Sequence, residues 1–312
     1  MVNTSTRNNA YAAAHFALNL DGAGDVGLFR SIEGGNVKAD VMTYQSGPIY
    51  DRWRQLGKPK FEDIKLQVGM AMSEPFYKWI EKFFLGNPDR KNGSIVAADF
   101  YYKERARREF TNALISEITM PKLDGADKSA AFMGIGLAVE GMVFKPGDGQ
   151  KIVQFKGWES QKLWTACNFR FRLDGFEDAC KRVTKVDGFT VKMNVLEYHG
   201  GGHRAPIKTP SPIDFPNLTF YLPEADAQPF FNHAQKRIIA NKAEQPGRLT
   251  GQISTYDNEL KDLFTIEFGG AEIISISPDK SDSSSEEIKQ VKIEIFTETM
   301  KFKYQPQATA VK

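Results

Sequence analysis

The chain has 312 residues, 26% of them charged, and a formal net charge of +2 at pH 7. So small a net charge excludes an overall electrostatic attraction to nucleic acid or to an anionic membrane. The length predicts about two domains, each large enough to bury its own core.

Metal-binding and targeting signals are missing from the sequence. Cys167 and Cys180 are the only cysteines, and with four histidines in the chain they supply too few ligands for a four-ligand zinc site. We expect two free thiols in a chain made in a reducing cytosol, with no metal and no other cofactor. The polar N-terminus MVNTSTRNN lacks the layout of a secretion signal, and no run of about 18 apolar residues occurs, which predicts a soluble protein that does not bind membranes.

The first predicted elements are two strands around a glycine turn. Residues 1–11 are expected to be a flexible arm. Apolar residues alternate over 14–21 and again over 36–44, and GAGDVG (22–27) lies between the two runs. GAGDVG also fits the dinucleotide motif GxGxxG, but that site requires a helix directly afterwards, and Gly34 and Gly35 interrupt the chain too early for one. We therefore reject a nucleotide site.

The stretch 45–59 is predicted to be a long loop rich in Gly, Pro, Arg and aromatic residues. Such loops in compact domains are usually functional. Tyr50, Trp53 and Arg54 are residue types favoured in protein interfaces, so we expect a subunit contact here. In the alternative interpretation, Trp53 only covers the end of its own domain.

A strand and an amphipathic helix follow, and the pair occurs twice. Residues 60–85 alternate through Ile64, Leu66 and Val68, and then place apolar residues on one helical stripe from Phe76 to Phe84, with Ser73 as the expected cap. Residues 214–241 repeat this order, with Asp226 as the expected cap and a stripe of Phe230, Ala234 and Ile238. The shift is 154 residues for both the strand and the helix, which indicates a duplication.

The duplication extends along most of the chain. FRFRLDG (169–175) matches FALNLDG (16–22), and 186–198 match 32–44. We predict domains over 12–150 and 167–304, a linker over 151–166 and a tail over 305–312. In the second domain HGGGHRAPIKTPSP replaces the first domain's aromatic loop, and we expect Gly200, Gly201, Gly202, His203 and Arg204 to make subunit contacts there.

The order of elements resembles the tail tube protein family of contractile-tailed phages. LEYHGG (196–201), a loop and DFPNLTFYLP (214–223) are similar to that family's EYxxGG-loop-xxNITLxxG signature. In the first half, YQSG stands where the paired glycines should be, so the family's loop contacts do not carry over to it. The resemblance implies an α+β, mainly β chain, with two tandem tail-tube-like antiparallel β-barrels or sandwiches, each with one flanking helix.

The resemblance further implies a structural component of a contractile tail or injection particle, made in the cytoplasm and assembled into a virion or phage-tail-like particle. Its partners would be copies of itself in a ring, neighbouring tube, sheath or baseplate and spike proteins, and DNA or protein cargo passing through the bore. Three chains would give a six-barrel ring suited to a hub or adaptor, whereas six chains would give two barrel layers suited to a tube subunit.

Two other functional classes fit the sequence less well. An enzyme is not expected, because no P-loop, GxSxG or HExxH motif occurs and no histidine pair has a third partner. A carbohydrate- or peptide-binding β-sandwich module is the main alternative. Such a module predicts a monomer with an exposed aromatic groove.

Overall fold

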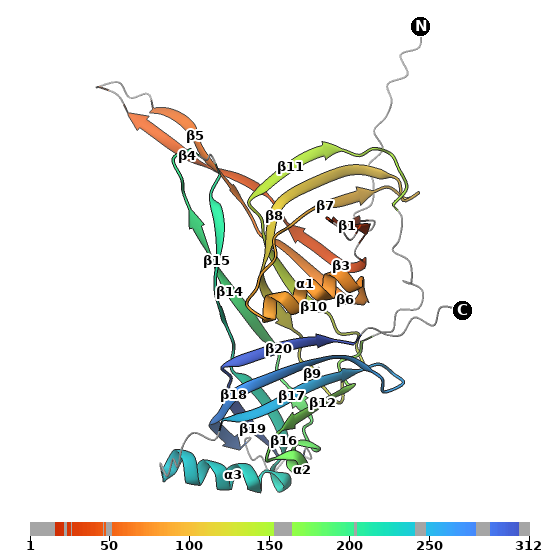
Figure 1. Ribbon diagram of the computed structural model, residues 1–312, viewed down its shortest axis with the longest axis vertical. Helices are drawn as coiled ribbons and strands as arrows, with labels where there is room; N and C mark the ends of the chain where they lie inside the picture. Colours follow the sequence, from red (N-terminus) through yellow and green to blue (C-terminus); the bar gives the residue numbers. More distant parts are fainter. Residues whose placement is uncertain are drawn as a thin grey trace.

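The computed structural model describes residues 16–21, 24–25, 27–45, 47, 52–152, 164–202, 205–240, 248–278 and 288–305. It consists of two mainly β halves joined end to end along the long axis of the molecule (Figure 1).

The described residues of the N-terminal half form eleven strands and one helix. These are β1 Phe16–Leu20, β2 Gly24–Asp25, β3 Gly27–Gly34, β4 Val37–Gln45, β5 Arg52–Phe61, β6 Ile64–Met72, α1 Glu74–Phe84, β7 Lys91–Ala98, β8 Glu104–Met120, β9 Leu123–Asp124, β10 Met133–Ala138 and β11 Gly141–Pro146.

Where the structure describes the C-terminal half, it has nine strands, one helical segment before β13 and three after β16. These are β12 Phe169–Leu173, α2 Glu177–Cys180, β13 Lys185–Val186, β14 Phe189–Tyr198, β15 Ile207–Asp214, β16 Leu218–Pro223, the 3-10 turn η2 Glu224–Asp226, α3 Gln228–Ala234, the π-helical turn η3 Gln235–Ile239, β17 Leu249–Tyr256, β18 Asp262–Pro278, β19 Gln290–Phe296 and β20 Thr299–Tyr304.

Each half is built on one long strand that belongs to two sheets. The first part of β8 pairs with β7 and β11, and its last part pairs with β10. Strand β18 does the same with β17, β20 and β19. The strand order β1-β7-β8-β10-β6 therefore recurs as β12-β17-β18-β19-β16, every pair being antiparallel. This confirms the expected fold of two tandem antiparallel β-barrels or sandwiches.

Helix α1 forms where the apolar stripe predicts it. Phe76, Trp79, Ile80, Phe83 and Phe84 are all buried, and Ser73 occupies the N-cap position. The prediction for the second helix is only partly correct. Phe230 is fully buried, but Ile238 is 47% exposed, and the N-cap residue is Ala227 because Asp226 is still in the preceding 3-10 turn.

The two loop predictions are wrong in the same way, because each stretch includes part of a β-strand that belongs to a hairpin. Strand β4 runs to Gln45 and β5 begins at Arg52, so much of 45–59 is strand. In the second half, β15 already begins at Ile207. Both strands contain prolines and charged residues with little apolar alternation, so their composition is that of a loop. The described end of the expected linker packs down, since Trp164 is buried with its ring edge against Phe264.

Candidate assembly interface

The two halves of the chain are joined by a hydrogen-bonded strand pair. Strand β14 of the C-terminal half pairs antiparallel with the last part of β8, with Val191 opposite Ile118 and Thr190 opposite Thr119. Val191 and Ile118 are both fully buried, and on the other face the Thr119 and Thr190 hydroxyls lie 3.0 Å apart in a hydrogen bond. One continuous sheet, β3-β6-β10-β8-β14-β15, therefore crosses from one half to the other.

Strand β15, which pairs with β14 in the same hairpin, is held to the N-terminal half through the backbone of Lys208. The Lys208 N–H donates to Glu140 Oε1 at 2.8 Å, and the Arg90 guanidinium donates to the Lys208 carbonyl oxygen. Arg90 Nη2 and Glu140 Oε1 lie 3.7 Å apart. This ion pair, which binds the Lys208 backbone on both its N–H and its carbonyl oxygen, is called the clasp below. The Lys208 side chain is itself buried, with Nζ 3.1 Å from Asp63 Oδ1.

A second contact joins helix α1 to strand β20. Tyr77 stacks on Tyr304 with ring centroids 3.9 Å apart, and Phe84 stacks on Phe302 at 5.9 Å. The Tyr304 N–H donates to Glu81 Oε1 at 3.0 Å. Burial raises the pKa of Tyr77 well above its ordinary value, with a further rise from Tyr304, so its hydroxyl stays neutral at physiological pH.

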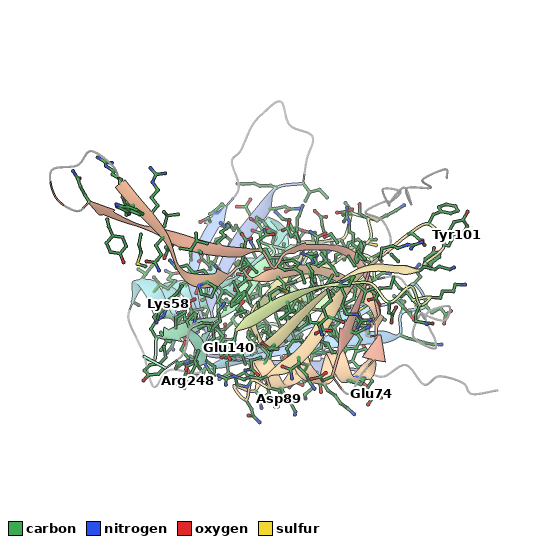
Figure 2. The ribbon with its side chains drawn as sticks, turned by 90° about the horizontal axis from the view of Figure 1, so that it is seen from above. Lys58, Glu74, Asp89, Tyr101, Glu140 and Arg248 are labelled. Carbon is green, nitrogen blue, oxygen red and sulfur yellow. The ribbon has the colours of Figure 1, made fainter. Side chains whose placement is uncertain are left out.

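The hairpin β4–β5 is built like β14–β15 but projects from the body of the molecule (Figures 1 and 2). Its pairs match those of β14–β15 at a shift of 154 residues throughout: Tyr44 faces Trp53 where Tyr198 faces Ile207. The ladder is irregular at Asp40 in one hairpin and at Asn194 in the other, again 154 residues apart. All of β4 is exposed, and within the described residues β4 and β5 pair only with each other.

The two hairpins lie near one another at the base of β5. The pKa of Lys60 is raised, mainly by its hydrogen bond and ion pair with Asp40 at 2.8 Å, and to a smaller extent by the carboxylate of Glu197 in β14. Glu197 also faces Lys208 across the β14–β15 ladder.

Five of the eight predicted contact residues lie in the described part of the chain, on or next to these two hairpins. Trp53, which is 71% exposed, and Arg54 lie on β5. Gly200 is buried just after β14, whereas Gly201 and Gly202 are exposed with open space around them. Tyr50, His203 and Arg204 lie outside the described residues.

Sequence reasoning missed the residues that hold the two halves of the chain together, a contact that we call the seam. Arg90, Glu140, Lys208 and Tyr304 carry no motif, and they are recognised only through contacts between distant segments. One signal was present: Arg90 and Glu140 each recur 158 positions later, as Arg248 and Glu298.

The described part of the chain contains no group of three or more His, Cys, Asp or Glu side chains placed to hold a metal ion. Nor does it contain a helix long and apolar enough to cross a membrane. Cys167 and Cys180 are both free thiols, and burial raises the pKa of Cys180 to about 12.

Comparison with known proteins finds one matching family model and several similar solved structures. The model of the T4-like virus tail tube protein gp19 family matches the chain twice, over residues 12–143 and 165–301. No curated protein matches the chain.

Among solved structures, the chain is similar to one from the PVC sheath-tube complex of an extracellular contractile injection system in the extended state. The identity is 18% and the TM-score 0.40, over 45% of this chain and 94% of that one. It is also similar to the tube terminating cap of the anti-feeding prophage, with 20% identity and a TM-score of 0.41, over 47% of this chain and 100% of that one. A third is the PVC sheath/tube terminator, with 19% identity and a TM-score of 0.39, over 45% of this chain and 99% of that one.

Proposed function

The chain belongs to the T4-like virus tail tube protein gp19 family, with which both of its halves match, and from this premise we propose that three copies close into a ring of six barrels. Membership of the family makes the chain a structural tail component. The proposed ring acts by assembly and not by catalysis, as a hub or adaptor layer between a sixfold tube and a threefold spike. The proposed domain bounds are 12–150 and 167–304.

The continuous sheet through β8 and β14 is the observation that supports three chains over six. Pairing between strand edges sets two barrels side by side in one layer. Two barrels in one layer per chain give six from three chains. Six chains would instead require each chain to span two stacked layers.

The ring would be made in the cytoplasm and built into a virion or phage-tail-like particle, where it would contact tube, sheath or baseplate and spike proteins. Its bore would pass DNA or protein cargo. The two hairpins, with Tyr50, Trp53 and Arg54 on one and Gly200 to Arg204 on the other, are the proposed contact surfaces.

A binding module is not supported by the hollow along the seam. The hollow of about 440 Å³ along the seam is lined by charged, small and aliphatic residues, among them Asp63, Glu117 and Lys192, and by no aromatic side chain. Carbohydrate and peptide grooves are typically lined with aromatic residues.

Mass and symmetry measured together test the proposal. We expect light scattering after size exclusion to show a concentration-dependent species of three chains, and negative-stain images to show rings with six lobes. Six chains per ring would favour the stacked arrangement. A monomer at every concentration would contradict the ring and favour the binding module.

A further inference from the structure

We propose, on the basis of the ring suggested above, that the contact between chains repeats the seam within the chain: the hairpin β4–β5 of one copy pairs with the end of β18 in a second copy. Both surfaces belong to this chain, so the partner is a second copy in a head-to-tail contact.

The first requirement is that β18 resembles β8, the strand that receives β14–β15. The two strands correspond at a shift of 158 residues. Phe110 and Phe268 pair with Met142 and Met300, and Asn112 and Gly270 both have positive φ, of 53° and 64°. Each ladder then skips one residue, at Ser116 in β8 and at Ile274 in β18.

The second requirement is that the receiving edge is free. In β8 this edge carries β14. In β18 the equivalent segment, 275–278, pairs only with β19 among the described residues, which leaves its other edge open, and the neighbouring Ile274 is 41% exposed. Unpaired strand edges favour pairing with another strand.

The shift of 154 residues between the hairpins and the shift of 158 residues between β8 and β18 define the register of the new contact. The pair of Val191 and Ile118 becomes Val37 opposite Ile276. The hydrogen-bonded pair of Thr190 and Thr119 becomes Asn36 opposite Ser277, two polar side chains that are both exposed. One interaction is not repeated, because Lys38 faces Ser275 where Lys192 faces Glu117.

The counterpart of the clasp is already present in the C-terminal half, where the second hairpin would bind. Arg248 and Glu298 lie 2.6 Å apart, and each follows its counterpart, Arg90 or Glu140, by 158 residues. Lys208 corresponds to Arg54, so Glu298 would accept the Arg54 N–H and Arg248 would donate to the Arg54 carbonyl oxygen. The place of Asp63 is taken by Asn217, which donates to Glu294 at 2.9 Å, so a carboxylate still lies near the incoming cation.

The helix contact has a free counterpart as well. In the seam, Phe84 of α1 stacks on Phe302 of β20. The equivalent residues are Ile238, after α3, and Phe144 in β11, which are 47% and 60% exposed. Figure 1 shows α3 at one end of the molecule and the hairpin β4–β5 at the other, as a head-to-tail contact requires. The same contact therefore explains both exposed apolar positions.

Disulfide trapping tests the register in the full-length chain with Cys167→Ser and Cys180→Ala. Adding Asn36→Cys and Ser277→Cys is expected to give, under mild oxidation, covalent species of two and three chains on a non-reducing gel. Thr119→Cys with Thr190→Cys is the matched control, and its disulfide should form within one chain. Asn36→Cys with Ser275→Cys lies two residues out of register, beyond the Cβ separation of about 4 Å that a disulfide allows, and should not link chains.

The outcomes separate this inference from the ring itself. Linked chains only from the out-of-register pair, or rings without any linked chains, would overturn the inference and leave the ring standing. Neither rings nor linked chains would overturn both.

A second variant does not depend on cysteine. Glu298→Gln should raise the dissociation constant between chains at least about tenfold, because it weakens a charge-assisted hydrogen bond at the contact. Glu140→Gln, in the seam, should affect stability and leave association unchanged. Equal effects of the two variants on association would contradict the proposal.

Discussion

Tyr77 of helix α1 and Tyr304 at the end of β20 stack face to face, with ring centroids 3.9 Å apart and an interplanar angle of 10°. The two rings come from opposite halves of the chain. Together with the β8–β14 pairing, the stack makes the halves one structural unit.

The first prediction concerns this stack. Tyr304→Ala should lower the free energy of unfolding by about 2–4 kcal/mol, somewhat below the usual cost of truncating a core aromatic because Tyr304 is only partly buried. Tyr304→Phe keeps the ring and should stay within about 0.5 kcal/mol of the parent. Urea denaturation followed by tryptophan fluorescence measures both values, and equal losses for Ala and Phe would show that the hydroxyl, not the stacking, is responsible.

The buried ion pair at the seam leads to the second prediction. The Lys208 side chain is 7% exposed and that of Asp63 is 41% exposed. Asp63→Asn should cost about 1–3 kcal/mol, because it leaves the Lys208 ammonium buried without its carboxylate. Lys208→Met removes the buried charge, keeps the backbone groups that Arg90 and Glu140 bind, and should change stability by less than about 1 kcal/mol.

A double-mutant cycle checks that explanation. If the cost of Asp63→Asn comes from the stranded charge, it should largely disappear in the Lys208→Met background. A cost that persists there would instead be due to the hydrogen bond from Ser116 to Asp63.

Two glycines pack against aromatic rings at equivalent places, which gives the third prediction. A Cβ on Gly93 would lie 2.6 Å from the Phe110 ring, and one on Gly251 would lie 2.5 Å from the Phe268 ring, with a backbone oxygen closer still in both cases. Gly93→Ala and Gly251→Ala should each cost about 1–3 kcal/mol by overpacking. Gly201→Ala, with open space around it, is the control and should be near neutral in the same thermal or urea denaturation.

The elements that could be predicted from the sequence are those with one buried face. Strand β6 and helix α1 were predicted because one face of each is fully buried, so their apolar residues recur at a fixed period. Strand β5 was missed because neither of its faces is buried in the chain, and without burial no alternation is required. The duplication showed that the segments of the two hairpins correspond, although it did not show that they are strands. The edge on which β14 pairs depends on contacts with β8, about 70 residues earlier in the chain, and no local pattern specifies it.

The last prediction concerns pH and the carboxylate of Glu272, which lies 2.6 Å from both His233 Nε2 and an Arg237 guanidinium nitrogen. Burial alone would raise the pKa of Glu272, but hydrogen bonds from His233 and Arg237 outweigh it, and the pKa is lowered. A carboxyl whose pKa is lower in the folded state stabilises the protein above its unfolded pKa of about 4.3, and this contribution is lost as the pH falls through the lower folded value. Glu272→Gln should therefore destabilise the protein at pH 7, and the difference from the parent should shrink as the pH falls below the unfolded pKa of about 4.3 and through the lower folded pKa. Urea denaturation at each pH measures it, and a difference independent of pH would mean that the side chain acts through packing or neutral hydrogen bonds and not through its charge.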